Sequence, residues 1–535
     1  MKIRSGRWTA VAVVGVLAAA STFVASCSAA REAIGISSAP LTVGGVVDIA
    51  PSRSELTGDW TPANAAMDAD TLCVASNGSQ WSWSQDHGTT WSTCNNLDAS
   101  CNGTLGTFTP DAGALAGWFM QGSDQTLVAD KLGHVVWVSM ADNNSGCSTA
   151  KGVVAMVSSD GGKTFDFGDA VLLNDTACSN GCQDQPDATF DFSTSPPTLL
   201  TSWRHQGVQS PPGAYGACTR RYFIDSTSHL QPMDDAQSVG SLGLGSIGSV
   251  RIRSGGGAMS VVYSTTDSVP SCPNTGTTSE GVAVVTSYDW GHSWTGSNSI
   301  FDGINNYSGC VLSGQVDIAR NPRNFDYVRA MDGTNYVIVQ DTKSTLRLFM
   351  NTTYGGAVNG GPLVTWREWC PGTWTTADGG ATTNWLTVGG TYCPTPFYTQ
   401  GQASADGGSG NSLAMPNLAS DDVGRLGVWF YEADSTDTMF HIHFRGNVSP
   451  RSPTSTWIDT DVSSNFTPGN CAGCSSPFRV LGDYQAMLVQ GGLRQPTCGA
   501  SGAFFPTWSF ADTGGLLDAA ATANPQTLDG GLTFP

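Results

Sequence analysis

Charged side chains are scarce in this sequence, where Asp, Glu, Lys and Arg together make up only 13% of 535 residues. Solvent-facing helices need Lys and Glu on their outer faces, so this scarcity argues against a helical protein. Basic residues are the scarcest, with 24 Lys and Arg against 44 Asp and Glu. The net charge of −20 therefore disfavours binding to nucleic acid or to an anionic membrane surface through charge. A hydrophobic share of 40% excludes wholesale disorder, and 65 Gly with 17 Trp favour short strands and tight turns.

Long hydrophobic runs are also missing. The apolar run at residues 9–20 follows a basic start and is too short to span a bilayer as a permanent helix, which is typical of an export signal. The segment Val24-Ala25-Ser26-Cys27 resembles the lipobox of bacterial lipoproteins. That resemblance implies removal of residues 1–26 and lipidation of Cys27, so that the protein is exported and anchored to a membrane surface through lipid alone. An ordinary signal peptide cut after Ala30, which would leave a secreted protein, is the alternative.

Cysteine parity fits export. Setting Cys27 aside leaves an even number, which in an exported chain predicts up to seven disulfides. The pair Cys471-Ala-Gly-Cys474 lacks the second close pair that a structural zinc site usually has. The cysteines concerned are Cys73, Cys94, Cys101, Cys147, Cys178, Cys182, Cys218, Cys272, Cys310, Cys370, Cys393, Cys471, Cys474 and Cys498.

One octapeptide pattern occurs three times, at 84–91, 158–165 and 287–294, and reads Ser-x-Asp-x-Gly-x-(Thr/Ser)-aromatic. It resembles the Asp box, or BNR repeat, of sialidases and related β-propellers. In such a turn the Asp carboxylate accepts hydrogen bonds from turn amides and Gly permits a positive φ. We therefore interpret the box residues Asp86, Asp160 and Asp289 as structural.

The boxes set the phase of strand-like runs along the chain. The first strand of each group is expected near residues 64, 125, 187, 249, 315, 415 and 485, a spacing typical of four-stranded blades that must stack radially. We predict an all-β fold with a single β-propeller of seven four-stranded blades over 41–515, with six blades as the alternative. Residues 27–40 are expected to form a tether, 370–412 an insertion and 516–535 an irregular tail. A strand over 43–49 is expected to complete the last blade and close the ring.

The resemblance implies that ligands lie over the central channel, on the rim formed by the links between blades and by the loops joining the second and third strands. Asp187 and Glu280 could supply an acid and a base there, with Tyr484 as a nearby nucleophile. The expected ligand-binding residues are Arg204, Arg251, Asp483, Trp374 and Trp385. Loop carboxylates such as Asp184 and Asp187 could hold calcium, and no other cofactor is expected.

An Arg-Ile-Pro motif, which sialidases carry near the start of the propeller, is absent. The sequence therefore favours a propeller that recognises carbohydrate, with a glycan or glycoprotein as partner. An active sialidase-like glycoside hydrolase with a pair of rim carboxylates, and a surface propeller that binds protein, are the alternatives.

Overall fold

A computed structural model covers the chain and describes strands and adjoining turns between Gly45 and Thr533. The larger segments outside the described residues are 1–44, 63–69, 96–114, 207–214, 240–246, 266–277, 300–310, 321–334, 369–385, 388–396, 400–412, 448–456, 464–486, 491–502 and 524–531, with shorter gaps elsewhere. All the regular elements of the described part are β-strands, and the all-β expectation is confirmed.

The described strands form seven antiparallel sheets, most of them meanders in chain order. The first contains β2 (Thr57–Thr61), β3 (Thr71–Ser76), β4 (Gln80–Ser84) and β5 (Ser92–Asn95). The second contains β6 (Phe119–Met120), β7 (Thr126–Ala129), β8 (Val135–Asp142), β9 (Gly152–Ser158) and β10 (Val171–Leu172). The third contains β11 (Gln183–Asp191), β12 (Thr198–Gln206), β13 (Tyr215–Ile224), β14 (Leu230–Pro232) and β15 (Gln237–Val239). The fourth contains β16 (Ile247–Gly255), β17 (Ala258–Thr265), β19 (Gly281–Ser287) and β20 (Asn298–Ser299).

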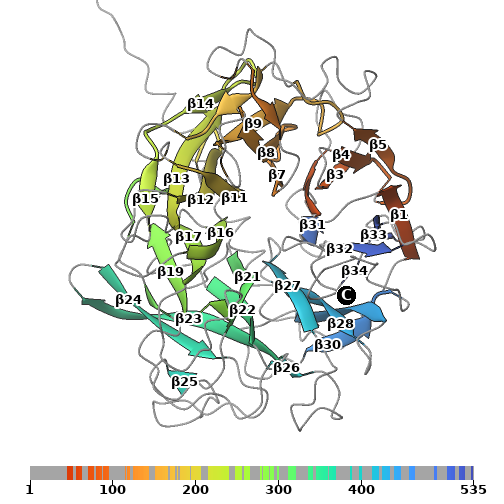
Figure 1. Ribbon diagram of the computed structural model, residues 1–535. Coiled ribbons are helices and arrows are strands. Elements are labelled where there is room, and N and C mark those ends of the chain that lie inside the picture. The colour runs from red at the N-terminus through yellow and green to blue at the C-terminus, as the bar shows by residue number, and fades with distance from the viewer. Residues whose placement is uncertain are drawn as a thin grey trace, which may run out of the picture.

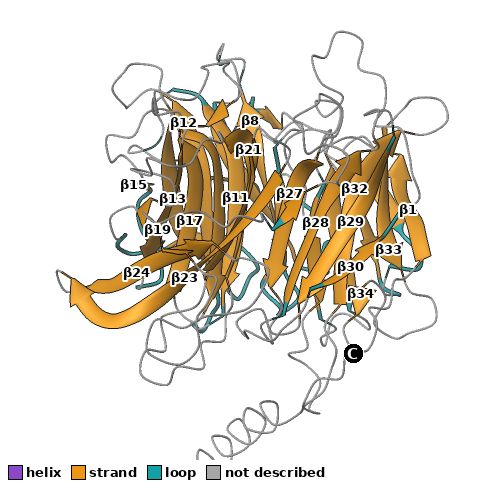
Figure 2. Ribbon diagram, turned by 90° about the horizontal axis from the view of Figure 1, so that it is seen from below, coloured by secondary structure: helices purple, strands orange, loops and turns teal. Residues whose placement is uncertain are grey.

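The remaining three sheets complete the molecule. The fifth contains β18 (Thr278–Ser279), β21 (Val311–Arg320), β22 (Asn335–Asp341), β23 (Thr345–Val358), β24 (Gly361–Glu368), β25 (Leu386–Thr387) and β26 (Tyr398–Thr399). The sixth contains β27 (Leu413–Ser420), β28 (Leu426–Ala433), β29 (Phe440–Asn447) and β30 (Ile458–Asp461). The seventh contains β31 (Met487–Gln490), β32 (Ala503–Ala511), β33 (Leu517–Ala523), β34 (Leu532–Thr533) and β1 (Gly45–Pro51). The hairpin of β23 and β24 projects from the body of the molecule (Figure 2).

The sheets surround a central axis (Figure 1). The inner strands contact one another in the order β2, β7, β11, β16, β21, β27 and β31, and β31 contacts β2 again. The ring is therefore closed, and the β-propeller expectation is confirmed. Pairing of β1 with β33 joins the N-terminal strand to the C-terminal part of the chain within one sheet, which fastens the closed ring.

Two boundaries differ from the sequence-based expectation. The first inner strand is β2 at Thr57–Thr61 rather than a strand near residue 64. The sequence did not indicate β2 because Gly58 and Asp59 have low strand propensity. Residues 517–523, expected in an irregular tail, form β33, which pairs with both β32 and β1. Its four alanines provide little strand signal, and its two neighbouring strands supply the pairing instead.

The three octapeptide turns share one hydrogen-bond pattern, and each joins the last two strands of its sheet. In the second turn, the Ser158 hydroxyl donates to Asp160 Oδ1 at 2.6 Å, and the Gly162 amide donates to Ser158 Oγ at 2.8 Å. Asp160 also accepts from the Thr164 amide at 3.0 Å and from the Thr164 hydroxyl at 2.7 Å. The first and third turns repeat these bonds.

The octapeptide carboxylates predict a pH-dependent contribution to stability. Partial burial opposes ionisation of Asp289, but hydrogen bonds from Ser293 and Ser287 lower its pKa below the ordinary 3.8. A lowered folded-state pKa stabilises the fold above pH 3.8, and this contribution is lost as the pH falls through the folded value. We expect Asp289→Asn to lower the free energy of unfolding by about 1 kcal/mol at pH 7, and the difference from the wild type to shrink below pH 3.8. Denaturant titrations at pH 7 and at pH 3 measure it, and a pH-independent difference would contradict this account.

The octapeptide glycine is required by space as well as by backbone conformation. Gly162 has φ +88°, and a Cβ there would lie 2.7 Å from Cys73 Sγ in the neighbouring sheet. Gly117 has a similar φ of +81° but no atom within 4 Å of its Cβ position. We expect Gly117→Ala to cost about 1 kcal/mol for the left-handed backbone alone, whereas Gly162→Ala should cost about 2–4 kcal/mol because it adds overpacking. Equal losses in denaturant unfolding would show that the contact with Cys73 is unimportant.

Candidate functional site

The octapeptide turns define one rim of the ring, and the starts of the inner strands lie on the opposite rim. The pairing register shifts near the start of four inner strands, between Asp184 and Asp187, Ile247 and Ser249, Val311 and Val316, and Ala414 and Asn417. Bulges of this kind redirect side chains and are common next to binding sites. Gln185, inside the first of these bulges, has a positive φ of 47°. These irregularities make this rim the candidate binding face of the ring.

An ion pair lies at this rim of the third sheet. Asp184 on β11 is directly opposite Arg204 on β12, and Arg204 Nη1 lies 3.1 Å from Asp184 Oδ2. Both side chains are largely buried, at 13% exposed for Arg204 and 11% for Asp184. Asp184 Oδ1 also accepts from the Gln185 amide at 3.1 Å. A planar guanidinium beside a held carboxylate can donate to and accept from neighbouring hydroxyl groups.

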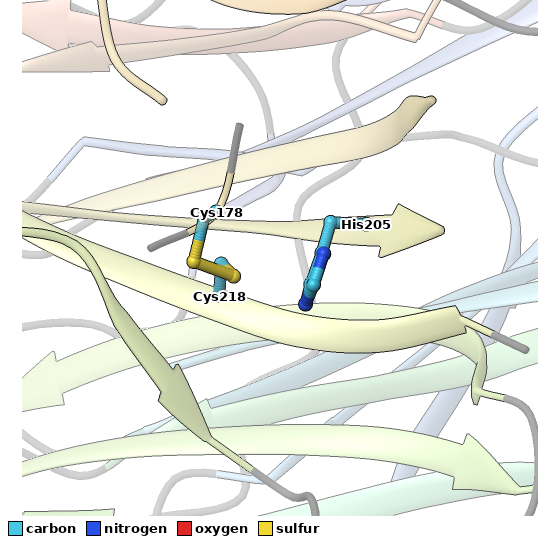
Figure 3. A group of neighbouring side chains, drawn as sticks. All are labelled: Cys178, His205 and Cys218. Atoms are coloured by element: carbon cyan, nitrogen blue, oxygen red, sulfur yellow. A yellow bond between two sulfur atoms is a disulfide. The ribbon is translucent and has the colours of Figure 1, made fainter. Parts of the chain in front are cut away.

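Two disulfides brace the same rim. Cys147 is bonded to Cys182 and thereby ties the loop after β8 to the start of the third sheet, and Cys178 is bonded to Cys218 on β13. The buried His205 lies beside the second bridge (Figure 3). The two sulfur atoms are bonded to each other, so this Cys-His-Cys group does not fit a metal centre while oxidised.

Cys73 differs from the expectation that the remaining cysteines pair into up to seven disulfides. It is a free, fully buried thiol on β3, and it lies 3.5 Å from the carbonyl oxygen of Gly162. Burial, with the charges of Asp160 and Asp59, raises the pKa of this thiol far above its usual range. The thiol is therefore a small packing group in the contact between the first and second sheets. Cys94 is disulfide-bonded.

Asp187, expected as an acid or base, is only 4% exposed and connects three sheets. Its Oδ2 accepts from Arg253 Nη1 at 2.7 Å and from the Ile252 amide at 2.9 Å, both on β16. Its Oδ1 accepts from the Thr126 hydroxyl on β7 at 3.3 Å. These bonds favour a structural carboxylate, and a catalytic or calcium-binding role for Asp187 stays a prediction. Arg251 is 6% exposed and donates to the Val250 carbonyl at 3.1 Å.

Most of the other predicted site residues lie outside the described part of the chain. They are Cys27, Glu280, Trp374, Trp385, Asp483 and Tyr484. The structure therefore brings together Asp184 and Arg204 and connects Asp187 to Arg253. The acid–base pair of Asp187 and Glu280, and ligand binding by Trp374 and Trp385, stay predictions.

Sequence reasoning missed one polar cluster, which lies in the sixth sheet. Glu432 on β28 and His441 and His443 on β29 place one ligand-type atom each within 4.8 Å of one another. The spacing His-Ile-His on a strand could have indicated it, since residues two apart share a face.

The sheets therefore form a closed β-propeller. Its link-side rim, which carries the connections from one sheet to the next and lies opposite the octapeptide turns, presents an ion pair near two disulfides. No protein-family model matches the chain, and no curated protein matches it. Solved structures do resemble it. The Hadza microbial sialidase Hz136 is 12% identical, with 85% of this chain and 73% of that chain covered and a TM-score of 0.38. The NanB sialidase from Streptococcus pneumoniae is 12% identical, with 81% and 72% covered and a TM-score of 0.40.

A lectin also resembles this chain. The Aleuria aurantia lectin, solved with alpha-methyl-L-fucoside, is 12% identical, with 80% of this chain and 99% of that chain covered and a TM-score of 0.35. At these identities and TM-scores the likenesses concern the fold alone. Within the described residues, no helix is long and apolar enough to cross a membrane.

Proposed function

We propose that this protein is an exported, lipid-anchored β-propeller that recognises carbohydrate at the link-side rim of the ring. The observation that carries the proposal is the ion pair of Asp184 and Arg204, which lies on the rim that two disulfides brace. A guanidinium and a carboxylate held in place suit the paired donors and acceptors of sugar hydroxyls. Rigid bracing also lowers the entropy lost on binding.

Recognition without hydrolysis is the favoured form of this proposal. Both oxygens of Asp187 are engaged in bonds that join sheets, and the sequence lacks the Arg-Ile-Pro motif. The solved structures that resemble this chain include sialidases and a lectin in complex with a fucoside, so a glycan array is the natural screen.

The test uses the detergent-purified full chain on a glycan array, with a panel of fluorogenic glycosides in parallel. We expect binding to one glycan class, and a loss of about 10- to 100-fold in affinity for Arg204→Gln, since bonds to a charged donor contribute about 1.5–3 kcal/mol. Leu132→Ser is the matched control, because Leu132 is 58% exposed in the turn between β7 and β8, beside the octapeptide rim. Thermal melting of each variant monitors folding.

Three other results of this experiment would each favour a different function or a different site. Turnover of a fluorogenic glycoside would replace the lectin-like proposal with glycoside hydrolysis. Absence of glycan binding, with capture of a protein partner that depends on Arg204, would favour the protein-binding alternative. Equal binding by Arg204→Gln and the wild type would move the site away from the third sheet.

Lipid anchoring has its own test. Cys27→Ser removes the thiol that the lipobox resemblance predicts to be acylated. The variant should incorporate no labelled fatty acid, whereas the wild type should be labelled and fractionate with membranes. An unlabelled wild type would instead support an ordinary cleaved signal peptide.

A further inference from the structure

The strand register brings four potential metal ligands to one face of the sixth sheet. Glu432 on β28 is paired directly with His441 on β29, and Asp461 on β30 is paired directly with His443. Directly opposed residues in a sheet point to the same face, and so do residues two apart on one strand. Two imidazoles and two carboxylates therefore project from one side of three adjacent strands.

Their atoms converge. His441 Nε2 lies 3.6 Å from Glu432 Oε2 and 3.3 Å from Asp461 Oδ1. His443 Nδ1 lies 3.6 Å from Glu432 Oε2 and 3.0 Å from Asp461 Oδ1. Ligand atoms at ~2.1 Å from a tetrahedral zinc ion are separated by about 3.4 Å. The four measured separations lie close to this value, and Glu432, His441 and His443 each place one ligand-type atom within 4.8 Å of the other two, so a modest movement would bring these groups around an ion.

The surroundings orient His443 as they do in protein metal sites. Its second ring nitrogen, Nε2, lies 3.4 Å from Asp459 Oδ1, and Asp459 in turn forms a close ion pair with Arg445. Arg445 is itself fixed, because it donates to the Phe397 carbonyl and lies over the Phe397 ring at 4.4 Å. A carboxylate on the far nitrogen of a ligating histidine sets its tautomer and raises its basicity.

Burial and solvent access fit an ion held at the edge of the fold. The side chains of Glu432 and His443 are only 12% and 11% exposed, so they lie in place before any ion arrives. His441 is 21% exposed and Asp461 is 64% exposed, which leaves an entry route from solvent. The mixed nitrogen and oxygen donors suit Zn²⁺ rather than Ca²⁺ or Mg²⁺, which prefer oxygen alone.

We propose that Glu432, His441 and His443 form a zinc site of the sixth sheet, with Asp461 as the fourth ligand. The ion would crosslink β28, β29 and β30 at this end of the sixth sheet.

The test uses the untagged, detergent-purified full chain, stripped of metal by dialysis against a chelator. We expect calorimetric titration with Zn²⁺ to give one bound ion per chain and the melting temperature to rise with zinc concentration. Co²⁺ in place of zinc should give visible absorption bands without the near-ultraviolet charge-transfer band of a thiolate ligand, since no cysteine takes part.

Variants separate this site from adventitious binding. His441→Ala should abolish stoichiometric zinc binding and the zinc-dependent rise in melting temperature. Asp459→Asn, which touches no metal, should weaken binding about 10- to 100-fold through His443. His229→Ala, a half-exposed histidine of the third sheet, is the matched control and should bind as the wild type does. Absence of zinc binding by the wild type, or undiminished binding by a folded His441→Ala chain, would overturn the proposal.

Discussion

Replacing Asp187 by Ala is expected to lower the free energy of unfolding by about 3–5 kcal/mol, the usual cost of removing one partner from a buried ion pair. The change leaves the Ile252 amide without its acceptor, and it leaves the Arg253 guanidinium beside a cavity between sheets. Three sheets lose their shared carboxylate at once, because Thr126 belongs to the second sheet and Arg253 to the fourth. Denaturant unfolding followed by tryptophan fluorescence measures this loss.

Two variants make the Asp187 experiment decisive. Asp225→Ala removes a partly exposed carboxylate whose hydrogen bonds run to Thr227, His229 and Gln231 of the same hairpin, so it breaks no contact between sheets and should cost less. A double variant with Arg253→Ala should lose less than the sum of the two single changes, because the two side chains share one interaction. If Asp187→Ala were as stable as the wild type and yet lost a glycosidase activity, Asp187 would be a catalytic residue and our structural interpretation would be wrong.

Trp137→Ala should also cost about 3–5 kcal/mol, as expected for truncating a fully buried large aromatic side chain. Trp137 is 0% exposed and meets Trp81 of the first sheet edge-on at 5.4 Å and Phe165 at 5.3 Å. Its indole N–H donates to Gln125 Oε1 at 3.2 Å. The substitution therefore opens a cavity at the contact between two sheets and orphans a buried acceptor.

Trp137→Phe is the matched variant, because it keeps most of the apolar volume and loses only the hydrogen bond and the second ring. We expect it to retain more than half of the stability that Trp137→Ala loses. Thermal and denaturant unfolding of both variants, with Leu132→Ala as an exposed control, measures the effect. Equal losses for Phe and Ala at this position would mean that the hydrogen bond, rather than packing, dominates.

The octapeptide turns are the part of the fold that the local sequence predicts best. The second octapeptide turn is held by hydrogen bonds among its own residues, Ser158, Asp160, Gly162 and Thr164. Its conformation can therefore be predicted from the local sequence without knowledge of the rest of the molecule. The aromatic residue at the end of the second octapeptide, Phe165, packs against Trp81 and Trp137. Phasing from these turns located most inner strands to within a few residues, since each strand group must repeat to bury its faces.

The partners of the candidate-site residues could not be predicted from the sequence, because they come from distant parts of the chain. Asp187 reads as a loop carboxylate in the sequence, and only the neighbouring sheets reveal its bonds to Thr126 and Arg253. Cys73 counts as one of an even set of cysteines, yet it is buried as a free thiol against Gly162, 89 residues further along the chain. Glu432 and Asp461 each meet the histidines of β29 only through strand pairing.

By itself, the sequence determined the all-β class, the repeating strand groups and the turn chemistry, because low charge, periodicity and short-range hydrogen bonds act between residues close in the chain. Only the tertiary structure decided that residues 517–523 form β33, which joins β1 to β32 in the seventh sheet, and which groups are the partners of Asp187, Cys73 and His443. These depend on which distant strands become neighbours when the ring closes, and that choice is made by packing whole sheets against one another rather than by any local pattern.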